Sequence, residues 1–88
     1  MASTGVHPRV CLRHPELSED DVLAAWKGVI ASSPRLQKDR DEYVAVGFDG
    51  NGRLLEMVAV RGANGHWLIY HAMTPPSART LGELGMGR

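Results

Sequence analysis

The sequence predicts one small α+β domain, with N-terminal helices packed on a three-stranded antiparallel meander and a short helix at the C-terminus. Apolar residues recur at helical spacing in the segment 19–31, and three segments rich in β-branched and aromatic residues follow it. Short glycine-containing turns join those three segments, which makes neighbouring strands antiparallel. The 88 residues suffice for one domain, so we expect residues 1–88 to fold as a unit with frayed ends at 1–6 and 86–88.

Two helices are expected before the strands. Pro8 suits the first turn of a short helix over residues 7–14, and Pro15 ends it because the residue before a proline avoids the α region. Ser18 is a good N-cap for the second helix, residues 19–31. The first turn of that helix is acidic, which its dipole favours.

A serine–serine–proline stretch at residues 32–34 is expected to stop the second helix. The charged segment that follows, residues 35–42, has no apolar periodicity, and two interpretations of it stay open. It is either a solvated connector or a segment whose basic residues contact phosphate groups. Those residues are Arg35, Lys38 and Arg40.

The predicted strands are Tyr43–Phe48, Arg53–Arg61 and His66–Thr74. Asp49-Gly50-Asn51-Gly52 separates the first two, and Asn64-Gly65 separates the second and the third. Because Gly and Asn tolerate positive φ, both connections are expected to be hairpin turns. After the strands, Thr74 is expected to cap a helix that starts with two prolines and ends near Gly85.

The register of the last two strands brings two ionisable side chains together. If Asn64-Gly65 is a two-residue turn, Val60 lies opposite Ile69. Glu56 and His71 then become diagonal neighbours on one face, within reach of each other. A carboxylate beside an imidazole can fix the tautomer of that ring, which suits general acid–base catalysis. The alternative is a half-buried histidine with a purely structural acid partner.

Both faces of the predicted meander are largely apolar. One face can pack on the amphipathic helix, and the other needs cover from the C-terminal helix or from another chain. A second copy of this chain, in a homodimer, or a different protein is therefore an expected partner.

Composition excludes several classes of protein. Ten basic and ten acidic residues give a formal net charge of zero, which argues against strong nonspecific nucleic-acid binding but permits a local basic patch. Cys11 is the only cysteine, so no intrachain disulfide forms. No apolar stretch approaches the ~20 residues of a membrane span and no secretion signal is visible, so we expect a cytoplasmic protein that binds no membrane.

No cofactor or metal site is expected. The four histidines match no zinc-binding spacing, and the chain has no phosphate-binding loop, dinucleotide fingerprint or nucleophile elbow. Arg53 and Arg61 flank the middle strand, where they either hold phosphate through bidentate hydrogen bonds or are simply solvated.

Several short motifs together resemble the BrnT branch of the RelE/ParE-like toxin superfamily. They are Arg13-His14 before an acidic capped helix, Val44-Ala45-Val46-Gly47, Gly52-Arg53-Leu54-Leu55 and Leu68-Ile69-Tyr70-His71-Ala72. The resemblance covers roughly residues 10–84. It implies a RelE-like fold and the toxin of a type II toxin–antitoxin system, typically a small ribonuclease that cuts mRNA without a metal and is neutralised by a cognate antitoxin. Met73 stands where this family usually has an arginine.

The residues and the resemblance together predict a metal-independent mRNA endoribonuclease. The predicted catalytic residues are His71, Glu56 and Arg53, with Glu56 or His71 as base. The predicted RNA-binding residues are Arg13, His14, Arg61, Arg79 and Lys38. The expected partners are an antitoxin protein and RNA, including mRNA on the ribosome. Two alternatives stay open, namely a noncatalytic interaction or dimerisation module and a gyrase-inhibiting toxin of the ParE type.

Overall fold

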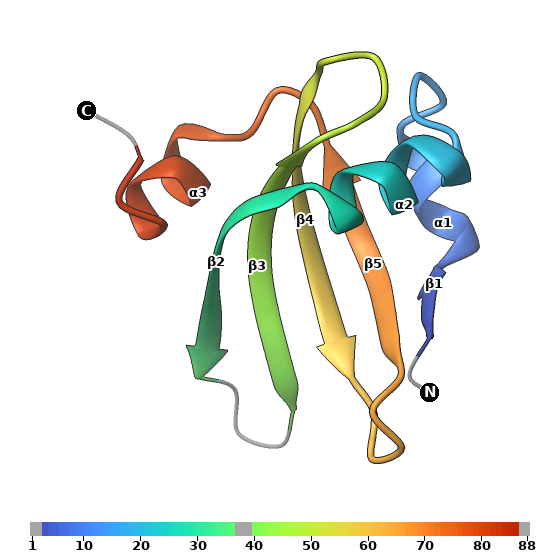
Figure 1. The fold of residues 1–88 in the computed structure, drawn as a ribbon, viewed down its shortest axis with the longest axis vertical. Helices are drawn as coiled ribbons and strands as arrows, with labels where there is room; N and C mark the ends of the chain where they lie inside the picture. The colour runs from blue at the N-terminus through green and yellow to red at the C-terminus, as the bar shows by residue number, and fades with distance from the viewer. Residues whose placement is uncertain (1–2, 37–39, 87–88) are drawn as a thin grey trace.

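A computed structural model describes residues 3–36 and 40–86 and shows an α+β fold, in which these residues form one five-stranded mixed sheet and three helices (Figure 1). The strands are β1 (Thr4–Val6), β2 (Val29–Leu36), β3 (Asp41–Phe48), β4 (Leu54–Arg61) and β5 (Trp67–Met73). Their order in the sheet is β1-β5-β4-β3-β2, with β1 parallel to β5 and the other neighbours antiparallel. The helices are α1 (Pro8–Arg13), α2 (Glu19–Lys27) and α3 (Ala78–Glu83).

The α+β class and the antiparallel meander of β3, β4 and β5 are confirmed, but β1 and β2 extend the sheet beyond the predicted three strands. Residues 4–6, expected to be frayed, pair with β5 as β1. The predicted helix 19–31 is too long, because α2 ends at Lys27 and Gly28 is its C-cap. The β-branched pair Val29-Ile30 begins β2 instead.

Both ends of the charged segment 35–42 belong to the sheet, so the segment is not a solvated connector throughout. Its first residues end β2 and its last residues begin β3. Arg35 lies opposite Glu42 in the ladder, so opposite charges face each other across the two strands. Lys38 lies outside the described residues.

A β-bulge in the β4–β5 ladder changes which β5 side chains share a face. At the end of the ladder far from the turn the predicted register holds, with Glu56 opposite Met73 and Val58 opposite His71. Closer to the turn the register shifts, and Val60 lies opposite Leu68 rather than Ile69. Ile69 therefore turns into the core, whereas Tyr70 and His71 both line a cavity on the opposite face.

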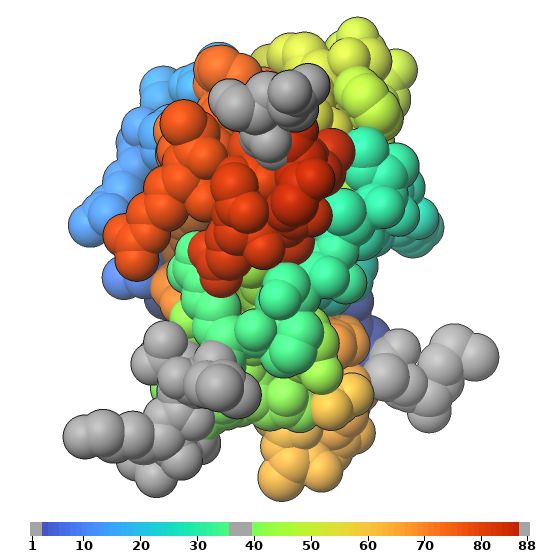
Figure 2. All heavy atoms as spheres, turned by 90° about the vertical axis from the view of Figure 1, so that its left-hand side faces the viewer, coloured from blue at the N-terminus to red at the C-terminus, as the bar shows by residue number. Residues whose placement is uncertain are grey.

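α3 covers part of that opposite face, on the side of the sheet where β2 lies (Figures 1 and 2). Its N-cap is Ser77, and the prediction of Thr74 as the cap is wrong. Arg35 of β2 donates to both carboxylate oxygens of Glu83, at 3.0 and 3.1 Å. Thr80, also in α3, is buried. The C-terminal helix is thus one of the two covers expected for the second face.

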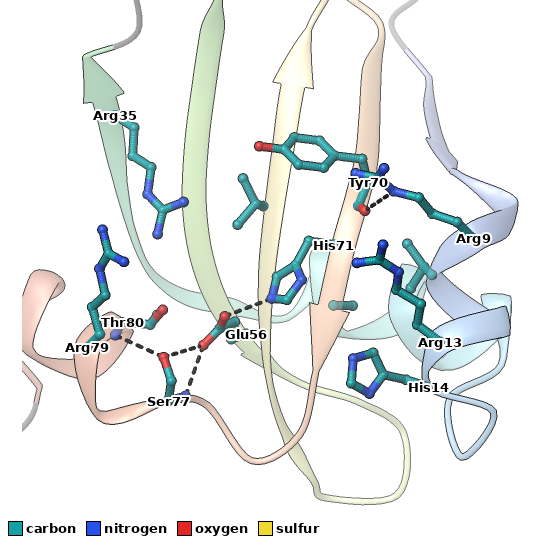
Figure 3. Close-up of a pocket in the computed structure, with 13 residues that line it drawn as sticks. Arg9, Arg13, His14, Arg35, Glu56, Tyr70, His71, Ser77, Arg79 and Thr80 are labelled. Atoms are coloured by element: carbon teal, nitrogen blue, oxygen red, sulfur yellow. Dashed lines mark hydrogen bonds and ion pairs between the residues drawn. The ribbon is translucent and has the colours of Figure 1, made fainter.

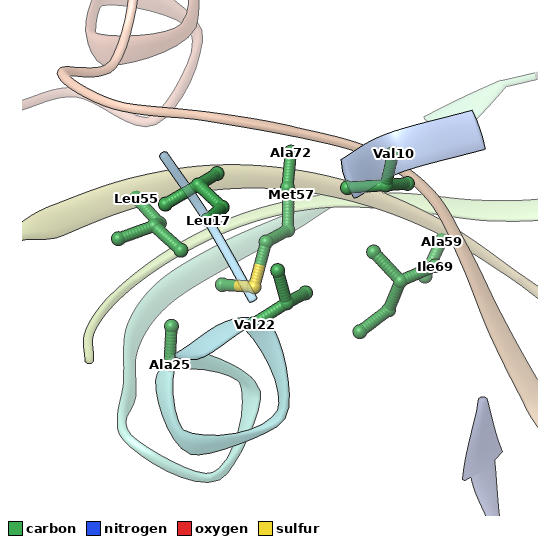
Figure 4. Packing of buried hydrophobic residues seen from close by; sticks show 9 residues of the cluster. All are labelled: Val10, Leu17, Val22, Ala25, Leu55, Met57, Ala59, Ile69 and Ala72. Atoms are coloured by element: carbon green, nitrogen blue, oxygen red, sulfur yellow. The ribbon is translucent and has the colours of Figure 1, made fainter. Parts of the chain in front are cut away.

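The hydrophobic core lies between the other face of the sheet and the N-terminal helices (Figure 4). Its buried members are Val10, Leu17, Val22, Ala25, Leu55, Met57, Ala59, Ile69 and Ala72. Gly47 lets α2 lie very close to β3, because it has no Cβ. A Cβ at this position would overlap the carbonyl oxygen of Ala25. No helix within the described ranges is long and apolar enough to cross a membrane.

Candidate active site

A cavity of about 410 Å³ lies on the face of the sheet opposite α2, between α1 and α3 (Figure 3). Basic side chains from separate elements converge on it, and Glu56 lies among them. The basic residues that line it are Arg9, Arg13, His14, Arg35, His71 and Arg79. The formal net charge of the chain is zero, yet this cavity concentrates cationic groups that suit an anionic ligand such as a phosphate.

Glu56 and His71 meet in this cavity, as the register predicts (Figure 3). Nε2 of His71 lies 2.8 Å from Oε2 of Glu56. The side chain of Glu56 is 8% exposed and that of His71 is 33% exposed, so the carboxylate is buried behind a ring that solvent reaches. The contact favours the tautomer with the proton on Nε2, which leaves Nδ1 as a proton acceptor.

Hydrogen bonds hold Glu56 in place. The backbone N–H and the hydroxyl group of Ser77 donate to Oε1, at 2.9 and 3.0 Å. Burial raises the pKa of Glu56, but the hydrogen bonds from Ser77 and His71 outweigh it, and the net pKa lies below the ordinary value. Glu56 is therefore ionised at neutral pH and is suited to orienting His71.

His14 occupies the other side of the cavity. It is the C-cap of α1, and its ring centroid lies 6.5 Å from that of His71, with the two ring planes at 88°. Its Nδ1 lies 3.5 Å from Oε2 of Glu16, and its side chain is 32% exposed. Two solvent-accessible imidazoles from distant parts of the chain therefore share one cavity.

The arginines of the cavity differ in their surroundings. Arg13 and Arg79, both predicted to bind RNA, line it and make no ion pair within residues 3–36 and 40–86. Arg35 is paired with Glu83, and Arg9 donates to the carbonyl oxygen of Tyr70 at 3.3 Å. Arg13 and Arg79 are thus the arginines best placed to bind a ligand.

The structure does not bring Arg53, a predicted catalytic residue, to this cavity. Its guanidinium group contacts Asp49 at 2.8 Å and Asp21 at 3.0 Å, and it donates to the carbonyl oxygen of Glu16 at 3.1 Å. These contacts hold the β3–β4 turn against the start of α2, so the role of Arg53 in this structure is to stabilise the fold.

Arg61 also lies outside the cavity, although it was predicted to bind RNA. It pairs with Asp41 at 2.6 Å, and its guanidinium group lies over the ring of Trp67 at 5.3 Å. It belongs to a separate aromatic cluster on the core side of the sheet. Lys38, also predicted to bind RNA, lies outside the described residues.

Ser77 is the cavity residue that sequence reasoning missed and could have found. It follows two prolines and directly precedes α3, where serine is a favoured N-cap residue, whereas the prediction began the helix at the prolines. No comparable local signal marks Arg9 or Tyr70, which reach the cavity through tertiary packing and the β-bulge.

No protein-family model, curated protein or solved structure matches this chain. In the part of the chain that the structure describes, no group of three or more His, Cys, Asp or Glu side chains is arranged to hold a metal ion. The function is therefore inferred from the chemistry of the cavity.

Proposed function

We propose that this chain is a metal-independent endoribonuclease, the toxin of a type II toxin–antitoxin system, whose active site is the cavity between α1 and α3. The observation that carries the proposal is the 2.8 Å contact between the buried carboxylate of Glu56 and the accessible ring of His71, in a cavity lined by four arginines. A carboxylate–imidazole dyad abstracts protons, and arginines bind phosphodiesters. The resemblance to BrnT toxins supports the toxin role and an antitoxin as partner.

In the proposed reaction, Nδ1 of His71 accepts the proton of an RNA 2′-hydroxyl group. The 2′-oxygen attacks the adjacent phosphorus, and the bond from phosphorus to the 5′-oxygen breaks, leaving a cyclic phosphate on one product. Glu56 fixes the tautomer of His71 and stabilises the imidazolium ion that forms. This division of roles follows from burial, because the accessible group of the pair is His71.

Arg13 and Arg79 bind the phosphate and stabilise the negative charge that develops on it. Both line the cavity, and they approach it from α1 and α3. Cationic groups preorganised around a transferring phosphoryl group stabilise the transition state. We assign to them the role of the family's arginine, whose position Met73 occupies here.

The test is cleavage of a labelled single-stranded RNA by the purified chain in excess chelator. The wild type is expected to produce fragments that end in a cyclic phosphate. His71→Ala should lower the rate on the order of 10²–10⁴-fold, because it removes the general base. His66→Ala is the matched control, since His66 contacts Ser3 away from the cavity. An inactive wild type, or equal activity of the two variants, contradicts the proposal.

Expression in a bacterial host distinguishes the alternatives. The proposal predicts growth arrest, mRNA cleavage and relief of both by His71→Ala. DNA damage signalling with intact RNA would indicate a gyrase inhibitor, and partner capture without cleavage would indicate an interaction module. The second face of the sheet, which such a module would use, carries the charged cavity and α3. Four large exposed apolar side chains come from four different elements: Leu12 of α1, Ile30 of β2, Phe48 of β3 and Leu68 of β5. A fifth, Met86, follows α3.

A further inference from the structure

The proposed reaction leaves one chemical requirement unmet by Glu56 and His71. The 5′-oxygen departs as an alkoxide unless a second group gives it a proton, and a positioned general acid accelerates that step. Glu56 is unsuited to this task, because it is nearly buried and accepts hydrogen bonds from Ser77 and His71. A general acid for this step would therefore be another residue of the cavity.

We propose that His14 is the general acid of the reaction, an inference that rests on the proposed function. Its ring and that of His71 both line the cavity, with centroids 6.5 Å apart. The structure shows no hydrogen bond between the two rings, so a phosphodiester bound beside them in the cavity can contact both imidazoles. Nδ1 of His14 is near Glu16, so Nε2 is the nitrogen available for a ligand.

The backbone fixes the position of His14. Its N–H donates to the carbonyl oxygen of Val10 at 3.0 Å, and its own carbonyl oxygen accepts from the N–H of Leu17 at 2.9 Å. Val10 and Leu17 are both core residues. His71 is fixed independently by the ladder of β5. The distance between the two backbone positions that carry the rings is therefore set by how α1 packs on the sheet.

The proton balance of the step is complete with these two residues. The proton of the 2′-hydroxyl group moves to Nδ1 of His71 as the bond from the 2′-oxygen to phosphorus forms. The bond to the 5′-oxygen breaks, its electron pair stays on that oxygen, and the oxygen takes a proton from Nε2 of His14. His71 ends protonated and His14 neutral, and exchange with solvent restores both.

A pair of substrates separates an acid from a residue that only binds RNA. One is a dinucleotide, and the other is a uridine 3′-phosphate esterified with nitrophenol, whose leaving group departs without a proton. His14→Ala should lower kcat for the dinucleotide on the order of 10²–10⁴-fold and leave kcat for the nitrophenyl ester nearly unchanged. His71→Ala should lower both, because each substrate needs the 2′-hydroxyl proton removed.

Two further variants complete the experiment. His14→Gln keeps a polar side chain that cannot donate an acidic proton, so it should behave as His14→Ala. Arg13→Ala, at the neighbouring position, should lower kcat/KM for both substrates alike, because the phosphate and its developing charge are common to the two reactions. Equal losses on both substrates for His14→Ala, or none on the dinucleotide, overturn the assignment. A wild type that cleaves neither substrate overturns the proposed function itself.

Discussion

Ser77 connects the C-terminal helix to the candidate catalytic carboxylate through one hydroxyl group. Its Oγ accepts from the backbone N–H of Thr80 at 3.2 Å and donates to Oε1 of Glu56 at 3.0 Å. The first contact caps α3, and the second holds Glu56 against His71. The same residue thus serves helix stability and the geometry of the dyad.

Ser77→Ala is therefore expected to affect stability and activity together. Loss of the cap should lower the free energy of unfolding by about 1 kcal/mol. RNA cleavage should fall as well, because Glu56 keeps the backbone N–H of Ser77 but loses the hydroxyl donor. Urea denaturation and cleavage rates measure the two effects, and Ser77→Thr, which restores a hydroxyl group, should recover both. Unchanged stability in the alanine variant would show that the cap is dispensable.

Among the helices and strands, those that depend on N-caps and short turns could be predicted from the sequence. Ser18 caps α2 through a reciprocal capping box with Asp21, and the hairpins join β3, β4 and β5 as an antiparallel meander. β2 escaped prediction because its proline resembles a helix stop. A proline can lie in β2 because this strand is at the edge of the sheet, where a missing N–H donor is tolerated. β1 has three residues and pairs with a distant strand, so no local pattern marks it.

In the candidate site too, some contacts could be predicted from the sequence and others depend on tertiary packing. Glu56 and His71 were paired from the sequence by assuming a two-residue turn at Asn64-Gly65. Next to the turn the observed register is one residue off that prediction, and the β-bulge restores the predicted pairing at His71. His14, Arg13 and Arg79 could be named, but their convergence on the pair depends on how α1 and α3 pack on the sheet. The β-bulge that places Tyr70 beside His71 leaves no trace in the alternation of apolar and polar residues. The prediction of Arg53 as a catalytic residue was wrong because the sequence did not reveal that Asp21 and Asp49 both pair with its guanidinium group.

The packing of α2 on β3 predicts the effect of one added methyl group. Gly47→Ala would place a Cβ against the carbonyl oxygens of Ala25 and Gly28. Backbone atoms cannot move aside as a flexible side chain can, so the free energy of unfolding should fall by about 1–3 kcal/mol or more. Gly50→Ala is the matched control, because its added Cβ would meet no atom within 4 Å. Equal urea midpoints for the two variants would contradict this account of the α2–β3 contact.

For the whole molecule, zero net charge is compatible with a basic active site because many carboxylates are engaged elsewhere. Asp21 and Asp49 neutralise Arg53, and Asp41 neutralises Arg61, all outside the cavity. Composition alone therefore underestimates how strongly the cavity attracts an anion. The charge that matters for an RNA ligand is local, and the fold creates it by sorting ion pairs away from Arg13 and Arg79.

The same engaged carboxylates predict how stability depends on pH. Five of them have a pKa below the ordinary value in the folded chain: Asp21, Glu42, Asp49, Glu56 and Glu83. For Glu42, burial raises the pKa, but hydrogen bonds from Arg40 and Tyr70 outweigh it. A carboxyl group whose pKa is lowered by folding binds protons more readily when unfolded, so stability rises with pH across its titration.

The contribution of these carboxyl groups to the free energy of unfolding should therefore be lost from about pH 4.5 downward, as they are protonated. Urea denaturation at a series of pH values between neutral and strongly acidic measures the curve. Glu42→Gln should make the acid-side slope shallower, because it removes one of the carboxyl groups that titrate differently in the two states. Glu16→Gln is the control, since Glu16 is half exposed and contacts His14 at only 3.5 Å. Stability that stayed flat or rose on acidification would mean that the hydrogen bonds to these carboxylates do not outweigh the cost of burying them.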